Sequence, residues 1–364
     1  MVDPTTGEYD DMPHIAPGNI EPFTGRILDN VKTVKEEQLI SGKFRFRPND
    51  VVYGKINPQL GKYFYASIDG LTSADAYVFN GKNGITQKFL YSVLQTKDFF
   101  KYSISVSKRS GMPKINRDEL NAYSFCVPKE EEQEKIGDFL LGIDNLITLH
   151  QRKCDETKKL KKFMLQKMFP KKDANKPEIR FAGFTDDWEQ RKLNEVAEFN
   201  PKSELPDEFE YVDLESVVGT EMISHRTETK DSAPSRAQRL AQPGDVFFQT
   251  VRPYQKNNYL FSKLDNNYVF STGYAQMRPN IDTAFLMSFL QTDSFVKIVL
   301  DNCTGTSYPA INSNDLSNLE ISLPKSFEEQ KKVGKTIISI DNLITLHQRK
   351  LFLNFVKKND WEQR

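Results

Sequence analysis

Few residues of this chain have the types and spacing of a catalytic centre. Asp50 and Lys55 form a carboxylate–lysine pair of the kind that nucleases use, but the corresponding positions in the second half of the chain hold Asp245 and Thr250. The sequence has no glycine-rich loop of the phosphate-binding type and no Walker lysine motif. We therefore do not expect an enzyme.

The cysteines and two of the histidines do not suggest a metal site either. Cys126, Cys154 and Cys303 lie far apart and none belongs to a Cys-x-x-Cys pair, so neither a disulfide framework nor a zinc site is expected. Unpaired cysteines fit a reducing cytoplasm. His150 and His347 have leucine, glutamine and arginine as neighbours instead of further ligands. Helix packing, or contact with a partner, is the expected role of both histidines.

An internal repeat is the main signal for the elements that position these residues. The eleven residues 143–153 recur without change at 340–350, at an offset of 197. Weaker matches lie upstream; they pair 48–51 with 243–246, 94–96 with 290–292, 113–116 with 309–312, and Gln133 and Gly137 with Gln330 and Gly334. A period this long indicates two homologous domains and not a solenoid. Each is a divergent globular part followed by a nearly invariant helix.

Short strands and helices are expected in the globular parts. Apolar, β-branched and aromatic runs after Pro-Asn or Pro-Gly turns predict buried strands at 50–53 and 245–248. Apolar residues three and four apart predict helices over 89–100 and 283–299. The expected fold class is α+β, with two homologous α/β domains.

A long helix is predicted after each globular part. Residues 131–169 contain no proline, and at 1.5 Å per residue such a helix spans roughly 50–60 Å. Apolar residues recur at the spacing of a coiled-coil seam; those predicted to pair the helices are Ile136, Ile143, Leu146, Leu160, Val333, Ile340 and Leu343. Because the two helices are nearly identical, each is the expected partner of the other. We expect them to lie antiparallel about a pseudo-twofold axis and to separate the two domains.

The composition limits the possible partners and the cellular location. The 364 residues include 50 basic and 50 acidic side chains, a balance that argues against non-specific coating of nucleic acid but permits binding through one basic face. No apolar run approaches the ~20 residues of a membrane span, and the first 20 residues do not read as a signal peptide. A cytoplasmic protein is expected.

Several motifs occur together in this repeated order. The second domain opens with Phe-Thr-Asp-Asp-Trp-Glu-Gln-Arg-Lys-Leu at 184–193, and Glu-Glu-Gln precedes each long helix at 131–133 and 328–330. With two divergent domains and two shared helices, the chain resembles the DNA specificity subunits of Type I restriction-modification systems over nearly its whole length. It departs from that pattern in the first domain, which lacks the opening segment.

The resemblance implies a division of labour. Each globular part would be a target recognition domain that reads one half of a bipartite double-stranded DNA sequence, and the helices would fix the spacer and dock two methylation subunits. Those subunits use S-adenosylmethionine, and restriction subunits use ATP and Mg²⁺, in defence against foreign DNA. This chain would be non-catalytic, with no cofactor or metal. The methylation subunits' Asn/Asp-Pro-Pro-Tyr/Phe motif is incomplete here at 57–60 and 200–203.

The expected segments follow from this organisation. They are a first target recognition domain at 1–128, a spacer helix at 129–169, a linker at 170–186, a second target recognition domain at 187–324 and a second spacer helix at 325–358. Residues 359–364 repeat the Asp-Trp-Glu-Gln-Arg of 187–191. We expect this tail to complete the first domain; a frayed chain end is the alternative.

Donor-rich loops are the expected DNA contacts, because Arg, Lys and Asn side chains commonly reach base edges. The candidates are Lys55, Asn57, Lys108, Arg109 and Lys114 in the first domain, and Arg252, Tyr254, Lys256, Thr304, Thr306, Ser307 and Tyr308 in the second. Arg226, Arg236 and Arg239 lie in another polar loop and are candidate phosphate contacts. The alternative is that these are ordinary solvated loop residues.

Two other functions remain open. The chain could be a recombined or orphan specificity cassette with one functional reading head, and its DNA target would then lack one defined half. It could also be a nuclease or methyltransferase with unrecognised motifs. In that case the purified chain alone would show metal- or cofactor-dependent activity.

Overall fold

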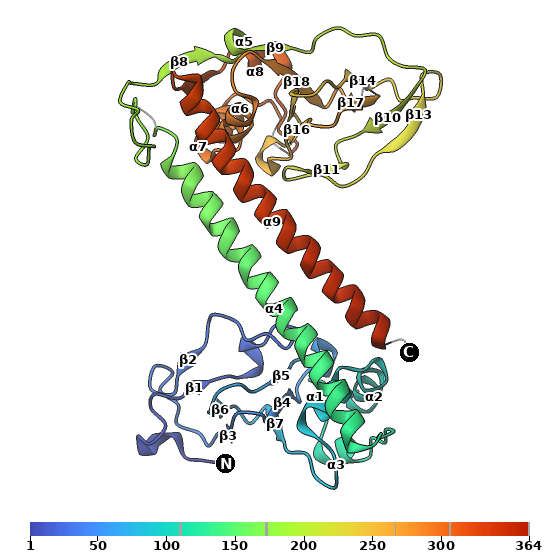
Figure 1. Ribbon diagram of the computed structural model, residues 1–364. Coiled ribbons are helices and arrows are strands. Elements are labelled where there is room, and N and C mark those ends of the chain that lie inside the picture. Colours follow the sequence, from blue (N-terminus) through green and yellow to red (C-terminus); the bar gives the residue numbers. More distant parts are fainter. Residues whose placement is uncertain (109–110, 172–173, 266, 306, 363–364) are drawn as a thin grey trace. The chain divides into compact units, whose positions relative to one another are not determined.

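The computed structural model describes residues 1–108, 111–171, 174–265, 267–305 and 307–362 (Figure 1). The chain divides into two compact units. Unit 1 contains Met1–Lys153 and His347–Arg364, and unit 2 contains Cys154–Leu346. Both long helices, α4 (Glu130–Lys167) and α9 (Phe327–Glu362), contribute one part to each unit.

The described residues of unit 1 form two sheets and three short α-helices besides their lengths of α4 and α9. The first sheet has the order β2-β1-β6-β3 and the second the order β5-β4-β7. The strands are β1 (Pro13–His14), β2 (Lys32–Thr33), β3 (Phe44–Phe46), β4 (Val51–Gly54), β5 (Tyr63–Tyr65), β6 (Gly70–Thr72) and β7 (Ala76–Phe79). The short helices are α1 (Gln87–Gln95), α2 (Lys97–Ser107) and α3 (Arg117–Asn121).

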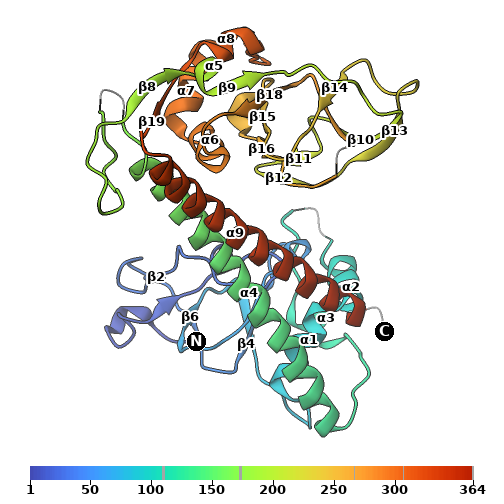
Figure 2. The same cartoon turned by 45° about the horizontal axis from the view of Figure 1, so that its top comes forward.

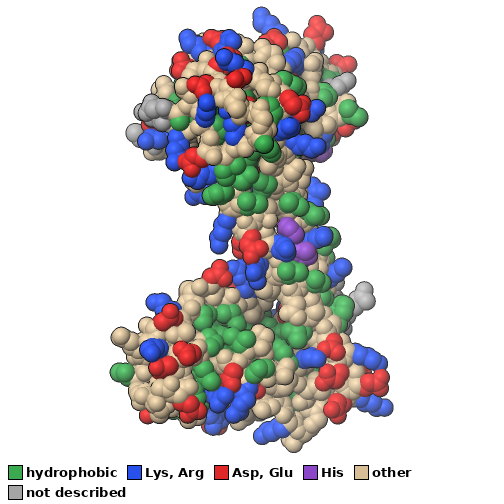
Figure 3. Space-filling view, turned by 60° about the vertical axis from the view of Figure 1, so that its left-hand side comes forward, with side chains coloured by type: hydrophobic (Ala, Val, Ile, Leu, Met, Phe, Trp, Pro, Cys, Tyr) green, Lys and Arg blue, Asp and Glu red, His purple; other side chains and the backbone are tan. Residues whose placement is uncertain are grey.

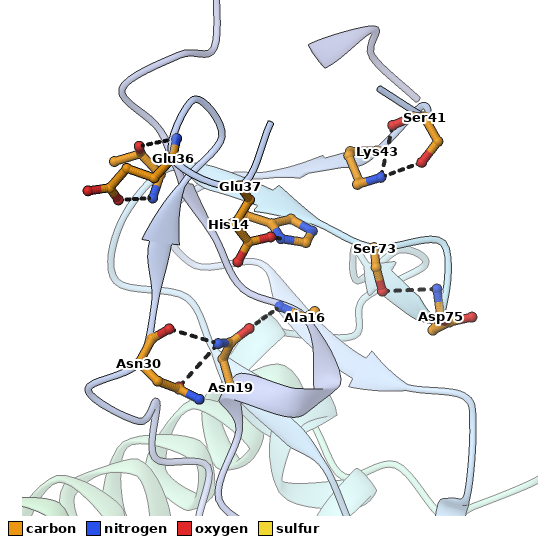
Figure 4. A network of polar contacts seen from close by, with 11 residues as sticks. His14, Ala16, Asn19, Asn30, Glu36, Glu37, Ser41, Lys43, Ser73 and Asp75 are labelled. Atoms are coloured by element: carbon orange, nitrogen blue, oxygen red, sulfur yellow. Dashed lines mark hydrogen bonds and ion pairs between the residues drawn. The ribbon is translucent and has the colours of Figure 1, made fainter. Parts of the chain in front are cut away.

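Polar contacts hold the loops around the first sheet (Figure 4). The His14 ring lies 2.7 Å from a carboxylate oxygen of Glu37. The Asn19 side chain accepts a hydrogen bond from the Ala16 backbone and donates to Asn30. These contacts connect the β1 segment to the loops that follow it.

Unit 2 repeats this arrangement with additional strands (Figure 2). Its sheets have the orders β13-β10-β17-β14, β16-β15-β18-β9, β19-β8 and β11-β12. The strands are β8 (Glu189–Lys192), β9 (Ala197–Phe199), β10 (Glu208–Val212), β11 (Val217–Val218), β12 (Glu221–Met222), β13 (Arg226–Thr229), β14 (Ala237–Leu240), β15 (Val246–Gln249), β16 (Tyr259–Leu260), β17 (Tyr268–Ser271), β18 (Tyr274–Pro279) and β19 (Glu320–Leu323). The short helices are α5 (Leu193–Val196), α6 (Thr283–Leu290), α7 (Asp293–Asp301) and α8 (Ser313–Ser317).

The predicted strands are confirmed as β4 and β15, and every residue of both is buried. Each short helix predicted from apolar spacing is instead two helices, α1 with α2 and α6 with α7. The break falls at the repeated Leu-Gln-Thr sequence. Thr96 and Thr292 have extended backbones and accept hydrogen bonds from the Phe99 and Phe295 amides, so each threonine caps a new helix.

Within each unit the two long helices run antiparallel. In unit 1, the Lys358 ammonium lies 2.6 Å from a carboxylate oxygen of Asp144, and the His150 and His347 rings approach to 3.2 Å between their Nδ1 atoms. In unit 2, Lys161 and Asp341 form the corresponding ion pair at 2.6 Å. Asp144 and Asp341 are 197 positions apart, and so are Lys161 and Lys358. The two copies of the repeat therefore form the same ion pair in both units.

The predicted seam is wrong at three positions. Ile143 and Ile340 are buried, but Leu146, Leu343 and Leu160 are 45%, 47% and 48% exposed. A 3–4 spacing is compatible with two neighbouring faces of a helix. The face that pairs in unit 1 also carries the buried Asp144–Lys358 contact, which an apolar pattern does not predict.

Repeated glutamines and glycines attach each long helix to its globular part. The Gln133 side chain accepts from the Thr86 amide and donates to Pro128, and the Gln330 side chain makes the equivalent contact with the Asp282 amide. A Cβ atom on Gly334 would lie 2.4 Å from the Phe285 nitrogen. Close backbone approach therefore explains why glycine recurs after the Glu-Glu-Gln element.

The second long helix extends further than predicted. It continues through Glu362 and not to residue 358, so Asp360 and Trp361 are helical. The same sequence at 187–191 leads into strand β8. Side chains beyond Lys358 lie outside the described part, so the expectation that the tail completes the first domain stays a prediction. Tertiary context therefore determines which conformation the Asp-Trp-Glu sequence adopts.

Candidate nucleic-acid interface

Two loops that are distant in the sequence meet in unit 1. The Asn57 amide donates to the Pro113 carbonyl at 2.8 Å, and the Ile115 amide donates to the Lys55 carbonyl at 3.0 Å. Ile56 and Lys114 form a β-bridge between these contacts. Three predicted contact residues, Lys55, Asn57 and Lys114, are thus brought to one place.

The backbone of unit 2 joins the corresponding two loops in the same way. We call each pair of joined loops a loop frame; the side chains on the two frames differ. The Arg252 amide donates to the Pro309 carbonyl at 2.8 Å, and Val251 forms a bridge with Ala310. The Arg252 guanidinium lies over the Tyr308 ring, 4.4 Å from its centroid. This stacking holds the arginine in place while the tyrosine remains exposed.

Both frames depend on a strained residue at the same position. Asn57 and Arg252 have φ values of 50° and 53°, in the left-handed region that side chains other than glycine seldom adopt. A proline follows each and starts a short 3₁₀ turn, η3 (Pro58–Leu60) or η4 (Pro253–Gln255). Such strain is concentrated at functional sites, which supports these turns as part of the interface.

The other predicted DNA-contact residues differ in how far their side chains are exposed. Lys108, Tyr254, Thr304 and Ser307 are exposed. Lys256 is directed into the protein, where its ammonium lies 2.5 Å from Asp293 and 2.9 Å from the Gln291 carbonyl. The ammonium of Lys256 is thus engaged within the unit. Arg109 and Thr306 lie outside the described residues.

The three candidate phosphate contacts have distinct surroundings. Arg226 is paired with Glu228 and Asp213, whose hydrogen bonds raise its pKa. Arg236 is exposed on the loop before β14. Arg239 is half-buried, burial lowers its pKa, and its Nε has no hydrogen-bond partner among the described residues.

Comparison with known proteins identifies the family of the chain. Residues 7–159 and 185–352 match the Type I restriction modification DNA specificity domain family. The chain belongs to this family. It is 33% identical over 129 residues to the Escherichia coli Type I restriction enzyme EcoDI specificity subunit, a match that covers 35% of this chain and 28% of that protein.

Longer matches are more distant. A putative Type I restriction enzyme MjaX specificity subunit from Methanocaldococcus jannaschii is 26% identical over 356 residues, covering 88% of this chain and 78% of that protein. The crystal structure of the Type I restriction-modification system S subunit from M. genitalium has a TM-score of 0.65 at 14% identity. It covers 100% of this chain and 90% of that chain. That likeness shows the shared specificity-subunit fold.

Sequence reasoning missed an exposed apolar surface on the specificity chain's long helices. Leu149 and Leu346, from the identical segments, are both close to half exposed, as are Leu146 and Leu343. Apolar side chains are visible at the surface of the helices in Figure 3. The signal in the sequence was the identity itself, because a segment repeated without change keeps its exposed residues as well as its buried ones.

The described residues give no sign of a metal site or of a single membrane span. No group of three or more His, Cys, Asp or Glu side chains among them could hold a metal ion. No single described helix is long and apolar enough to cross a membrane; α6 and α7 together, bent by 66°, reach the required length and composition.

Proposed function

We propose that this specificity subunit reads a bipartite DNA target, with the loop frame of each unit contacting one half. One observation carries the proposal: the two units share the same loop frame, but the side chains on it differ between them. Lys55, Asn57 and Lys114 occupy it in unit 1, and Arg252 with Tyr308 in unit 2. A shared frame with divergent donors suits two half-sites of different sequence.

The remaining polar residues would position the DNA without reading it. Arg239 is one proposed phosphate contact, because its side chain is only half-buried and no carboxylate pairs with it among the described residues. Lys108 and Ser307 lie exposed beside the frames. Arg226 is held by two carboxylates and would contribute less charge.

The long helices would hold the other subunits of the complex. The leucines exposed in both identical segments form equivalent apolar surfaces, one in unit 1 at 146–149 and one in unit 2 at 343–346. Two equivalent surfaces suit two methylation subunits, with S-adenosylmethionine, and then restriction subunits, with ATP and Mg²⁺. The chain would act in the cytoplasm as the non-catalytic member.

The proposal is tested by co-expressing the chain with a methylation subunit and mapping N6-methyladenine across the host genome. The expected result is a split motif with two short defined halves around a fixed gap. Lys114→Ala should relax only one half, and Arg252→Ala only the other. A matched control, Lys135→Ala, removes an exposed lysine from helix α4 and should leave the motif unchanged.

Other outcomes contradict the proposal in distinct ways. A motif with one defined half would favour the cassette with one functional reading head. Methylation or cleavage of DNA by the purified chain alone would instead favour an enzyme. Relaxation of both halves by either single substitution would contradict the assignment of one half to each frame.

A further inference from the structure

One guanidinium on the loop frame of unit 2 has a fixed place but no charged partner. The Arg252 guanidinium lies 4.4 Å from the centroid of the Tyr308 ring. Among the described residues no carboxylate pairs with it and no acceptor takes a hydrogen bond from it. Other arginines of unit 2 instead form ion pairs with carboxylates; these are Arg180, Arg191, Arg226 and Arg278. The donors of Arg252 are therefore available to a ligand.

Buried amide side chains brace the turn that carries Arg252. The Gln249 side chain donates to the Val251 carbonyl at 2.6 Å and to the Gln255 side chain at 3.0 Å. The Asn258 side chain accepts from the Gln249 backbone amide at 3.0 Å. Gln249 and Asn258 are only 3% and 1% exposed. These hydrogen bonds therefore hold the backbone on both sides of Arg252 from within the protein.

The far end of this turn is tied to the region of helix α7. Lys256 follows η4, and its ammonium donates to Asp293 and to the Gln291 carbonyl. The Gln291 side chain donates back to the Lys256 carbonyl at 3.3 Å. The matching positions of unit 1 hold no amide or ammonium side chain; they are Gly54, Leu60, Gly61 and Tyr63. Unit 1 therefore lacks the side chains that brace the turn in unit 2.

The loop that carries Tyr308 is also held by backbone contacts. Thr304 and Ala310, on either side of Tyr308, exchange backbone hydrogen bonds at 2.9 and 3.0 Å. Tyr308 is nevertheless 63% exposed, and Tyr254 on the facing turn is 49% exposed. The stacked Arg252 and Tyr308 thus lie at the protein surface, where a macromolecule can reach them, while the backbone beneath both residues is fixed.

The donors of a guanidinium match the edge of one base. Guanine presents two acceptors, O6 and N7, side by side in the major groove, and one guanidinium can donate to both. Adenine presents one acceptor beside an amino donor, cytosine an amino donor, and thymine one acceptor beside a methyl group. Arginine has donors only, so none of these three edges satisfies it as well. A guanidinium that is held in place and unpaired therefore selects guanine.

We propose that Arg252 reads a guanine in the half-site of unit 2 and that Tyr308 positions its guanidinium for this contact. This assignment rests on the proposed function, because it requires the loop frame of unit 2 to face base edges. A phosphate would also accept from two guanidinium donors. The braced turn and the stacked ring favour a base, because discrimination between base edges needs donors that are held in one geometry, whereas a phosphate contact only positions the protein.

The test first maps N6-methyladenine in cells that co-express a methylation subunit with the unmodified chain or with the Arg252→Asn chain. Asparagine suits a left-handed turn, as Asn57 does at the matching position of unit 1. We expect Arg252→Asn to relax a single position of one half, and that position to be a G·C pair. The matched control, Arg191→Asn, removes an exposed arginine of strand β8 that pairs with carboxylates, and should leave the motif unchanged.

Duplex binding by the purified complex of the chain with a methylation subunit then measures the preference for guanine. The unmodified chain should bind the G·C duplex at least about fivefold more tightly than duplexes with another base pair at that position. Substitution by 7-deazaguanine, which lacks the N7 acceptor, should weaken this binding, and the Arg252→Asn chain should bind all these duplexes alike. Tyr308→Ala should lose most of the preference, whereas Tyr308→Phe keeps the ring under the guanidinium and should retain it.

Three results would overturn the guanine assignment while leaving the bipartite reading intact. Arg252→Asn would relax no G·C position, or it would weaken binding to all the duplexes equally, as the loss of a phosphate contact does, or 7-deazaguanine would bind as well as guanine. A full preference in the Tyr308→Ala chain would contradict the positioning role. A motif without a defined half for unit 2 would overturn both this assignment and the proposed function. Circular dichroism of the Arg252→Asn chain, together with an unchanged other half, establishes that the relaxation is not a loss of folding.

Discussion

Replacing Lys358 by methionine should destabilise unit 1 strongly. The Lys358 and Asp144 side chains are only 9% and 8% exposed, and their charged atoms are 2.6 Å apart. Methionine keeps the apolar stem but leaves Asp144 buried without its cation. Breaking a buried ion pair in this way typically costs about 3–5 kcal/mol, because the remaining charge is uncompensated.

The pH dependence of that cost follows from the carboxyl group. Burial raises the pKa of Asp144 even though Lys358 and Gln95 lower it. Removing Lys358 raises this pKa further, so the folded state holds a proton more tightly than the unfolded state. Stability from such a raised pKa is complete below the ordinary carboxyl pKa and is lost as the pH rises through the folded value. The variant should therefore be least impaired in acid.

Urea unfolding followed by helical circular dichroism, at pH 5 and pH 8, measures both effects. The control is Lys135→Met, which breaks the exposed pair with Glu131 and should cost less than about 1 kcal/mol at either pH. The double variant Asp144→Leu/Lys358→Met should recover most of the lost stability. A cost for Lys358→Met no larger than that of the control, or the same at both pH values, would refute the reasoning.

Three further predictions address the DNA contact, the paired histidines and the packed glycine. Arg239→Gln should weaken DNA binding similarly on all sequences and reduce the slope of log affinity against log salt by about 1, measured by anisotropy titrations. Burial, the facing His347 and a nearby lysine lower the pKa of His150, so thermal stability should fall as the pH drops below about 6.5, less so in His150→Gln. Gly334→Ala should lower the unfolding temperature, whereas Gly142→Ala, with no atom within 4 Å of the added carbon, should raise it slightly.

Elements with a strong local signal were predictable from the sequence. The Pro-Asn and Pro-Gly turns placed β4 and β15 correctly, and the identical segments placed both long helices. The division of the short helices was missed because Thr96 and Thr292 interrupt an apolar spacing that continues across them. A threonine caps a helix through a hydrogen bond to a backbone amide three residues later, and the spacing of apolar residues carries no information about that bond.

The pairing face of the helices could not be read from apolar spacing alone. Leu146 and Ile147 are neighbours of similar hydrophobicity, yet Ile147 is 4% exposed and Leu146 is 45% exposed. The choice depends on the register of the partner helix, which brings Lys358 onto Asp144 and His347 onto His150. Charged residues look like surface positions until that register is known.

The sequence predicted which loops form the candidate interface, and their DNA contacts stay a prediction; the surroundings of the individual side chains could not be predicted. Lys55 and Arg252 were selected because they follow predicted strands, and the structure joins each of their loops to the Pro-x-Ile-Asn element itself. Lys256 was selected by the same reasoning, but Asp293, 37 residues away, engages its ammonium. A long-range ion pair of this kind depends on the packing of α7, which no local pattern encodes.

Under the proposed function, the left-handed turns would let one backbone arrangement carry two unrelated sets of half-site contacts. A residue other than glycine in this conformation costs about 1–3 kcal/mol, and arginine tolerates it less well than asparagine does. Arg252 nevertheless adopts it, since Pro253 and the bond to the Pro309 carbonyl fix the backbone around it. The frame therefore constrains the backbone and leaves the side chain free to vary. If these side chains read DNA as proposed, exchanging the donors would alter the DNA sequence that is read while the hydrogen bonds joining the two loops stay the same.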